Sequence, residues 1–214
     1  MESYHTESFS ETGEPLEEPP VEEPEEKGSG ILRFILDVVE TLILSVLLFA
    51  GINTVSARIR VDGFSMEPSL HTGEFVIVNK LAYRLGSPKI GDVIVFHYPR
   101  DPQQEYIKRV IGLPGDRVVV SDGQVTVNGA VLNEPYISAP PAYQTEIIVP
   151  SDSLYVLGDN RNNSSDSHNW GPVPLNYVVG KAILVYWPPE QWGWIAHPSI
   201  ANAAQHTGSN GQNP

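Results

Sequence analysis

The pattern of apolar and polar positions separates one apolar stretch near the start of the chain from a longer body of short alternating segments. Residues 41–57, TLILSVLLFAGINTVSA, carry no charge. As a helix these residues would measure about 26 Å, slightly less than a hydrocarbon core of about 30 Å. The turns before them, where Arg33, Asp37 and Glu40 share one helix face, make up the difference. The pattern predicts one transmembrane helix over residues 31–57 with an amphipathic beginning.

Two other interpretations of this stretch stay open. A buried core helix would have a similar composition, and the uncharged run is short for a membrane span. Residues 55–57, Val-Ser-Ala, also resemble the small-residue end of a cleavable secretory signal, although such signals begin with positive charge and this leader is negative. One Lys and one Arg precede the span and two Arg follow it closely, so the positive-inside rule hardly favours either orientation.

Residues 58–188 alternate between apolar and polar positions over short distances, which is typical of strands. Asp122-Gly123 and Asn128-Gly129 tolerate the positive φ that type I′ hairpin turns require. Signals for helices are few. The body is therefore predicted to be mainly β, an antiparallel sandwich or a partly open barrel. Strands are expected at residues 75–78, 92–97, 106–113, 117–120, 124–127, 154–157 and 178–186.

Composition distinguishes both ends of the chain from this body. Residues 1–30 hold ten Glu against one Lys, which is −9 of the net charge of −13, and we expect a disordered acidic tail. Residues 189–214 form a C-terminal extension that should be partly disordered, with Trp192 and Trp194 either at a membrane interface or packed on the body. The remainder is only mildly acidic, which argues against nucleic-acid binding. The chain has no cysteine, which excludes disulfides and thiolate sites.

Three polar motifs could carry chemistry. In residues 63–70, GFSMEPSL, Ser65 lies beside glycine and near proline; a serine becomes nucleophilic when a nearby base takes its proton. In residues 106–116, YIKRVIGLPGD, Lys108 lies in an apolar strand pattern, where it and the next residue face opposite sides. Residues 158–168, GDNRNNSSDSH, follow a strand pattern and suit a hydrogen-bonded bracing loop. Taken alone, Ser65 is more often an ordinary loop residue, Lys108 more often a strand-edge lysine that faces solvent, and the third motif is also compatible with a surface turn.

In this order, the three motifs resemble those of the bacterial type I signal peptidases. Residues 91–96, GDVIVF, and 180–182, GKA, are similar to further segments of that family, and the likeness covers about residues 31–188. The resemblance implies a membrane-bound serine endopeptidase that removes signal peptides after a small-x-small site. Its partners would be exported pre-proteins and the lipid bilayer, its catalytic domain would be extracytoplasmic, and it would need no cofactor or metal.

The resemblance also implies roles for single residues. Ser65 would attack the scissile carbonyl, Lys108 in its neutral form would take the hydroxyl proton, and Ser164 would orient the lysine amine. Support of the oxyanion and of the bracing loop would come from Gly63, Asp159, Arg161 and Asp166. Shallow pockets for small side chains would be lined by Val61, Met66, Leu70, Tyr106 and Ile107. Gly63 stands where some members have a hydroxyl that donates to the oxyanion, and His168 stands where Arg is common.

The proposed base makes a demand on its surroundings. An exposed lysine has a pKa near 10.4, and burial among apolar neighbours can lower it by about 3–5 units. A carboxylate in contact with the Lys108 amine would oppose this, so we expect none there.

Three other functions fit parts of the pattern. A self-cleaving Ser–Lys regulatory protease would need a DNA-binding domain. A non-catalytic membrane-tethered β module would use the motifs only to brace its fold. A classical triad would use His71, His97 or His168, none of which lies in a recognisable triad motif.

Overall fold

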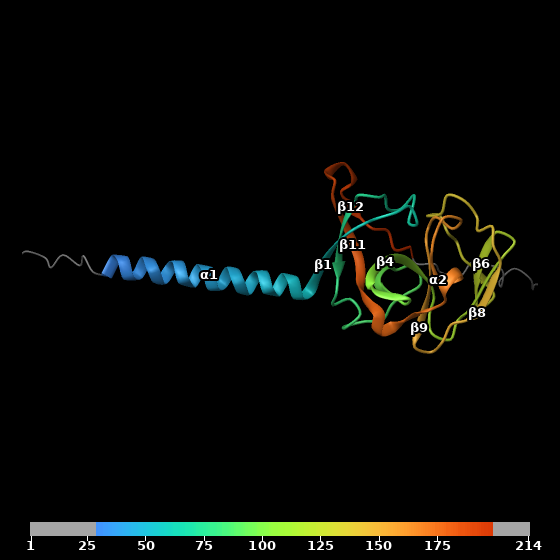
Figure 1. Cartoon of the computed structure of the whole chain (residues 1–214), viewed down its shortest axis with the longest axis horizontal. Coiled ribbons are helices and arrows are strands. Elements are labelled where there is room, and N and C mark those ends of the chain that lie inside the picture. The colour runs from blue at the N-terminus through green and yellow to red at the C-terminus, as the bar shows by residue number, and fades with distance from the viewer. Residues whose placement is uncertain (1–28, 199–214) are drawn as a thin grey trace, which may run out of the picture. The chain divides into compact units, whose positions relative to one another are not determined.

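The computed structural model describes residues 29–198 and separates two units, residues 1–48 and 49–214, each of which is considered by itself (Figure 1). Helix α1, Ser29–Val55, is long and apolar enough to cross a membrane, and none of its most apolar window is buried. It begins two residues earlier than predicted and also ends two residues earlier. The expected acidic tail, residues 1–28 for the most part, lies outside the described residues.

The described part of the second unit contains the end of α1 from residue 49 on, twelve strands and three short helical segments. All seven predicted strand segments are found, with ends shifted by up to five residues. The strands are β1 (Ser56–Arg60), β2 (Phe75–Asn79), β3 (Val93–Tyr98), β4 (Asp101–Gly112), β5 (Arg117–Ser121), β6 (Gln124–Val127), β7 (Ala130–Val131), β8 (Thr145–Ile148), β9 (Ser153–Leu157), β10 (Val173–Pro174), β11 (Val178–Trp187) and β12 (Gly193–Trp194). The helical segments are α2 (Ser167–Trp170), η1 (Leu175–Tyr177) and η2 (Pro189–Gln191).

These strands form two antiparallel sheets. The larger has the order β1-β2-β11-β3-β4-β9-β10, with β12 paired to β11, and the smaller has the order β7-β6-β5-β8. In Figure 1 the smaller sheet, marked by β6 and β8, lies at the end of this unit away from β1. Among the described residues neither sheet closes into a barrel. The predicted fold class, mainly β and antiparallel with one N-terminal apolar helix, is confirmed.

Both predicted hairpin turns have the backbone that their sequences require. Asp122 and Gly123 have φ of 52° and 75°, and Asn128 and Gly129 have φ of 53° and 83°. Positive φ at both central residues matches the right-handed twist of the strands on either side. The first turn joins β5 to β6 with Ser121 opposite Gln124, and the second joins β6 to β7.

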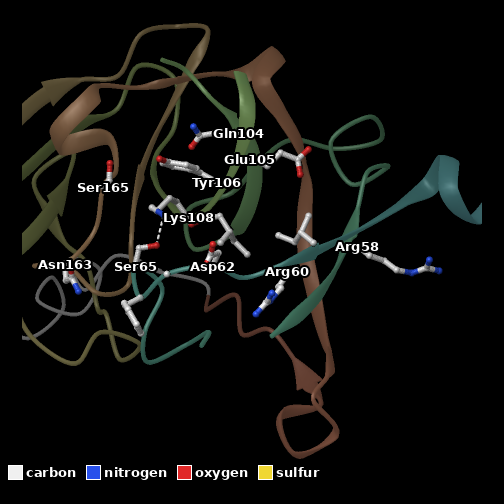
Figure 2. A pocket seen from close by; sticks show the side chains of 14 residues that line it. Arg58, Arg60, Asp62, Ser65, Gln104, Glu105, Tyr106, Lys108, Asn163 and Ser165 are labelled. Carbon is white, nitrogen blue, oxygen red and sulfur yellow. Dashed lines mark hydrogen bonds between the residues drawn. The ribbon is translucent and has the colours of Figure 1, made fainter. Parts of the chain in front are cut away.

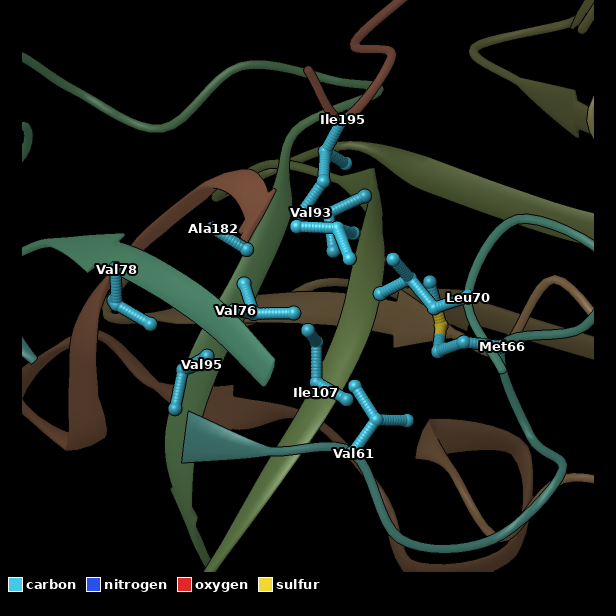
Figure 3. Close-up of a cluster of buried hydrophobic side chains, with 11 residues drawn as sticks. Val61, Met66, Leu70, Val76, Val78, Val93, Val95, Ile107, Ala182 and Ile195 are labelled. Atoms are coloured by element: carbon cyan, nitrogen blue, oxygen red, sulfur yellow. The ribbon is translucent and has the colours of Figure 1, made fainter. Parts of the chain in front are cut away.

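A hydrophobic core fastens the segment around Ser65 to the larger sheet. Met66 and Leu70 are each 1% exposed and pack in one cluster with Val76 of β2 and Val93 of β3 (Figure 3). Burial of a side chain of this size contributes roughly 1.5–3 kcal/mol to folding. The segment that carries Ser65 is thus held by two buried side chains on the C-terminal side of the serine.

The C-terminal extension is described only as far as residue 198. In that part η2 and β12 fold back along β11, with Trp194 opposite Leu184. Trp192 and Trp194 remain 72% and 79% exposed, so they do not pack into the body. The rest of the predicted disordered end lies outside the described residues.

Candidate active site

Ser65 and Lys108, 43 residues apart, meet through their side chains. Lys108 extends from β4, and its Nζ lies 2.7 Å from Ser65 Oγ and 2.8 Å from the Ile107 carbonyl oxygen (Figure 2). A protonated amine donates to both oxygens. A neutral amine has a lone pair and can instead accept the serine proton, so the contact suits nucleophile activation.

The environment of Lys108 makes the neutral amine easier to form than in an exposed lysine. The residue is 4% exposed, and burial lowers its pKa from 10.5 to about 8, while the charges of Asp166 and Asp159 partly oppose this effect. The two hydrogen-bond partners of the amine are a hydroxyl and a carbonyl, in keeping with the expectation that no carboxylate touches it. A lysine with this pKa is a competent base near neutral pH.

The third motif holds the backbone of the Ser65 segment. The Asn160 N–H donates to the Ser65 carbonyl at 3.0 Å, and Asn160 Nδ2 donates to the Phe64 carbonyl at 3.1 Å. Gly158 lies so close that a Cβ there would collide with the Ser65 carbonyl oxygen and the Ser164 side chain. Sequence reasoning gave Asn160 no role, although it stands inside the predicted bracing motif.

Asp159 braces the site through a buried ion pair that sequence reasoning missed. Both of its oxygens accept from Arg109, at 2.8 and 2.7 Å, and the two side chains are 0% and 1% exposed. Arg109 Nη1 also donates to the carbonyls of Gly91 and Ala196. Because Arg109 follows Lys108 on β4, the strand presents the base on one side and this anchor on the other.

A second buried ion pair lies beside the first. Arg161 donates to both oxygens of Glu134, at 2.8 and 2.7 Å, and through Nε to the Gly158 carbonyl at 3.0 Å. The ring of Tyr136 lies 4.1 Å from the Arg109 guanidinium and 5.8 Å from that of Arg161. Asp159 and Arg161, predicted to brace the loop, therefore belong to one buried network. Glu134 and Tyr136 had no recognisable signal in the sequence.

Asp166 closes the bracing loop at its far end. It caps the short helix α2 and accepts from the Gly158 N–H at 2.9 Å, which joins the two ends of the third motif. His168 Nδ1 lies 2.6 Å from Asp166 Oδ1 and its ring stacks on Tyr143. A neutral imidazole can form this contact by donating from Nδ1.

Two expectations about the site differ from the described structure, one about a hydrogen bond and one about the lining of the pocket. The Ser164 hydroxyl is buried without a hydrogen-bond partner among the described residues, so the expected bond to the Lys108 amine is not formed. Met66, Leu70 and Val61 lie in the core and do not line the pocket beside Ser65, because their side chains point into the sheet (Figure 3). Of the predicted pocket residues, Tyr106 and Ile107 line it.

The Ser65–Lys108 pair opens into a pocket of about 700 Å³. One wall is the segment from Arg58 to Ser65, and the other is residues 104–108 of β4. Figure 2 shows Asn163 and Ser165 on one side of the pair and Arg60 on the other. Gly63 lines the pocket with φ of +92°, and nothing occupies the position that its Cβ would take.

Both walls of this pocket present strand edges without a partner among the described residues. β1 is the edge strand of the larger sheet, and residues 105–108 of β4 pair with β3 on one side only, since the pairing with β9 begins at Arg109. Such edges can take an additional extended chain through backbone hydrogen bonds.

The comparisons with known proteins agree with this architecture. The family model described as "Signal peptidase, peptidase S26" matches residues 34–187. "Probable signal peptidase I-2" of Synechocystis sp. (strain ATCC 27184 / PCC 6803 / Kazusa) is 43% identical over 178 residues, 79% of this chain and 81% of the relative. "Signal peptidase I" of Leptolyngbya laminosa is 40% identical over 198 residues, 88% of this chain and 98% of the relative. These matches place the chain among the peptidases. It belongs to the signal peptidase family, peptidase S26.

Proposed function

We propose that this chain is a membrane-bound serine endopeptidase that removes signal peptides from exported pre-proteins after a small-x-small site. Ser65 is its nucleophile and Lys108 its general base. The observation that carries the proposal is the 2.7 Å contact between Ser65 Oγ and a buried Lys108 whose pKa is lowered to about 8. The relative from Leptolyngbya laminosa, 40% identical to this chain, is named signal peptidase I.

Proton transfers in this mechanism pass through one amine. Neutral Lys108 takes the Ser65 proton as Oγ attacks the scissile carbonyl, and the resulting ammonium then protonates the leaving amine. A water molecule then attacks the acyl-enzyme as it gives a proton to Lys108, and Lys108 returns that proton to Ser65 Oγ when the ester bond breaks and the product leaves as its carboxylic acid. The family implies the Ser65 backbone N–H as a donor to the oxyanion. Gly63 brings no hydroxyl as a second donor, and such a donor contributes roughly 3–4 kcal/mol where it exists.

The substrate would lie as an extended strand between the two open edges. Alternate side chains of a strand face the same way, so the residues one and three positions before the cut would face the floor of the pocket. Tyr106 and Ile107 from β4 line it, and Met66 lies in the core cluster that contains Ile107. A pocket backed by well-packed core accepts small side chains and excludes large ones.

Helix α1 would cross the membrane and anchor the second unit outside the cytoplasm. Its length and exposed apolar surface support the span, and the orientation is the one that the resemblance to type I signal peptidases implies. Protease added to intact spheroplasts should cleave within residues 58–198 and spare the N-terminal tail. Digestion of the tail alone would contradict this orientation.

Cleavage of a pre-protein that carries an Ala-x-Ala site tests the central proposal. Ser65→Ala and Lys108→Ala should each lower kcat/KM by several orders of magnitude, and the double variant should be hardly worse, because the two residues act as one unit. His71→Ala and His168→Ala serve as controls for a histidine-based triad and should retain activity. A Lys108→Ala protein with most of its activity would refute the dyad, and an inactive wild type would favour a non-catalytic β module.

A further inference from the structure

A second hollow, of about 360 Å³, shares no lining residue with the pocket at Ser65. One side is the loop that follows β2, which contributes Lys80, Arg84 and Ser87. The other side is apolar and comes from η1 and the start of β11, including Leu175 and Val178. The lining residues include no Asp or Glu. The hollow thus combines two cations and a hydroxyl with an apolar wall.

Its two cations are available to a ligand. Neither Lys80 nor Arg84 forms an ion pair with a carboxylate of the described residues, and Arg84 is exposed. The nearby carboxylate of Asp92 is already occupied, since Lys181 Nζ lies 2.6 Å from one oxygen and Tyr83 donates to the other at 2.9 Å. The hydrogen bond from Tyr83 also holds the middle of the loop after β2 in place, so Lys80 and Arg84 extend from a fixed backbone.

The hollow lies next to the last turn of α1. The Lys80 backbone N–H donates to the Val55 carbonyl at 3.0 Å, and Lys80 Nζ lies 3.4 Å from the Asn53 carbonyl. Where an apolar helix leaves a bilayer, the groups around its end lie at the level of the lipid headgroups. Two apolar side chains at the hollow, Leu85 next to Arg84 in the chain and Leu175 in the lining, are 86% and 38% exposed to solvent. Exposed leucines beside cations suit a surface that meets both acyl chains and phosphate.

We infer that this hollow binds the phosphate of an anionic phospholipid headgroup, with Lys80 and Arg84 as the phosphate ligands. The inference rests on the proposed membrane span of α1. Lys80 is a compact point charge beside the helix end, and Arg84 offers a planar fork for phosphate oxygens. A headgroup bound here would attach the unit that begins at residue 49 directly to the lipid surface, in addition to its connection through the chain of α1.

Lipid binding to the full-length chain in a neutral detergent tests this site. Native mass spectrometry would measure binding of short-chain phosphatidylglycerol, of short-chain phosphatidylcholine and of inorganic phosphate. Wild type should bind phosphatidylglycerol more tightly than the zwitterionic lipid. Lys80→Gln with Arg84→Gln should weaken binding of phosphatidylglycerol about 25-fold, since each basic residue near an anionic surface contributes roughly fivefold.

Arg100→Gln with Arg117→Gln is the matched control, because it removes two exposed cations that lie outside the hollow and should leave binding unchanged. Equal weakening in the control would show a general charge effect and overturn the site. Unchanged binding in the Lys80/Arg84 variant would also overturn it, as would inorganic phosphate that binds as tightly as phosphatidylglycerol, which would assign the site to a free anion.

Two further measurements keep the test decisive. A photoreactive phosphatidylglycerol should label residues 80–88 of wild type, and labelling confined to other segments would refute the site even if the double variant failed to fold. Cleavage of an Ala-x-Ala peptide in the neutral detergent should be the same for wild type and the Lys80/Arg84 variant. If wild type did not cleave the peptide, the proposed function would be contradicted. The lipid site would still be tested by the binding measurements, so the two failures can be told apart.

Discussion

The pH dependence of peptide cleavage follows directly from the state of Lys108. With a pKa of about 8, roughly a tenth of the free enzyme carries a neutral Lys108 at pH 7, half at pH 8 and nine tenths at pH 9. Only the neutral amine can accept the Ser65 proton. We therefore expect kcat/KM to rise about fivefold from pH 7 to 8 and about tenfold from pH 7 to 9.

The assay is kcat/KM for a peptide that has an Ala-x-Ala site and no group that titrates between pH 6 and 10, measured in neutral detergent. The midpoint of the rise in kcat/KM on the acid side of the pH profile reports the pKa of the base in the free enzyme. A midpoint near 6.5 would indicate histidine as the base, and a midpoint above 10 would mean that burial does not perturb Lys108. A flat profile between pH 6 and 9 would refute the reasoning altogether.

A carboxylate variant checks the cause of the pKa. Asp166 is the larger of the two charges that hold the pKa of Lys108 up against burial. Asp166→Asn should therefore move the acid limb to lower pH, even where loosening of the loop reduces the maximal rate. Asp122→Asn, in an exposed turn between β5 and β6, removes the same charge elsewhere and should leave the midpoint in place. An unchanged midpoint in the Asp166 variant would show that its charge does not act on the amine.

Two further predictions concern how the site is held. Gly158→Ala should lower kcat/KM on the order of 100-fold, because the added Cβ would displace Ser65 and small displacements in an active site have effects of this size. Gly193→Ala, where there is room for a Cβ, should be neutral. A fully active Gly158 variant would contradict the contact. Glu134→Gln should reduce the free energy of unfolding, measured in urea, by about 3 kcal/mol because it leaves Arg161 buried without its counter-charge. Glu146→Gln, in the exposed pair with Arg117, should reduce it by less than about 1 kcal/mol. Equal reductions would contradict the distinction between the buried and the exposed pair.

The sequence predicted the fold better than it predicted the site. Buried strands such as β9 can be predicted from their apolar runs. β1 was missed although its residues alternate, because its first two residues were assigned to the end of the apolar helix. The chemistry of Ser65 and Lys108 could be inferred from motifs, although spacing alone does not reveal a contact across 43 residues. The Asp159–Arg109 pair, 50 residues apart, was invisible for the same reason.

The misplacement of Met66 has a simpler cause. Neighbouring side chains along a segment point to different sides, so a residue next to a nucleophile does not have to line its pocket. Here Ser65 faces the pocket while Met66 is 1% exposed in the core. The resemblance named the segment but could not assign its faces. For the same reason Met66→Ala would create a cavity and destabilise the fold, so it is a poor test of specificity.

The burial that lowers the pKa of Lys108, the proposed base, also costs stability, and the sign of that cost can be tested. Its pKa is lower in the folded chain, about 8, than the 10.5 of an exposed lysine, so the unfolded chain binds more protons between these values and stability rises with pH across that window. At pH 7 the full cost, about 3 kcal/mol, is present. Lys108→Met should therefore stabilise the inactive protein at pH 7, less the loss of two hydrogen bonds, each about 1 kcal/mol. Urea unfolding in detergent at pH 7, 8, 9 and 10 would show this gain shrinking as pH rises, while exposed Lys89→Met should give a difference that does not vary with pH. A gain that stays constant or grows with pH would mean that folding does not lower the pKa of Lys108, and it would contradict the proposed role of Lys108 as the base.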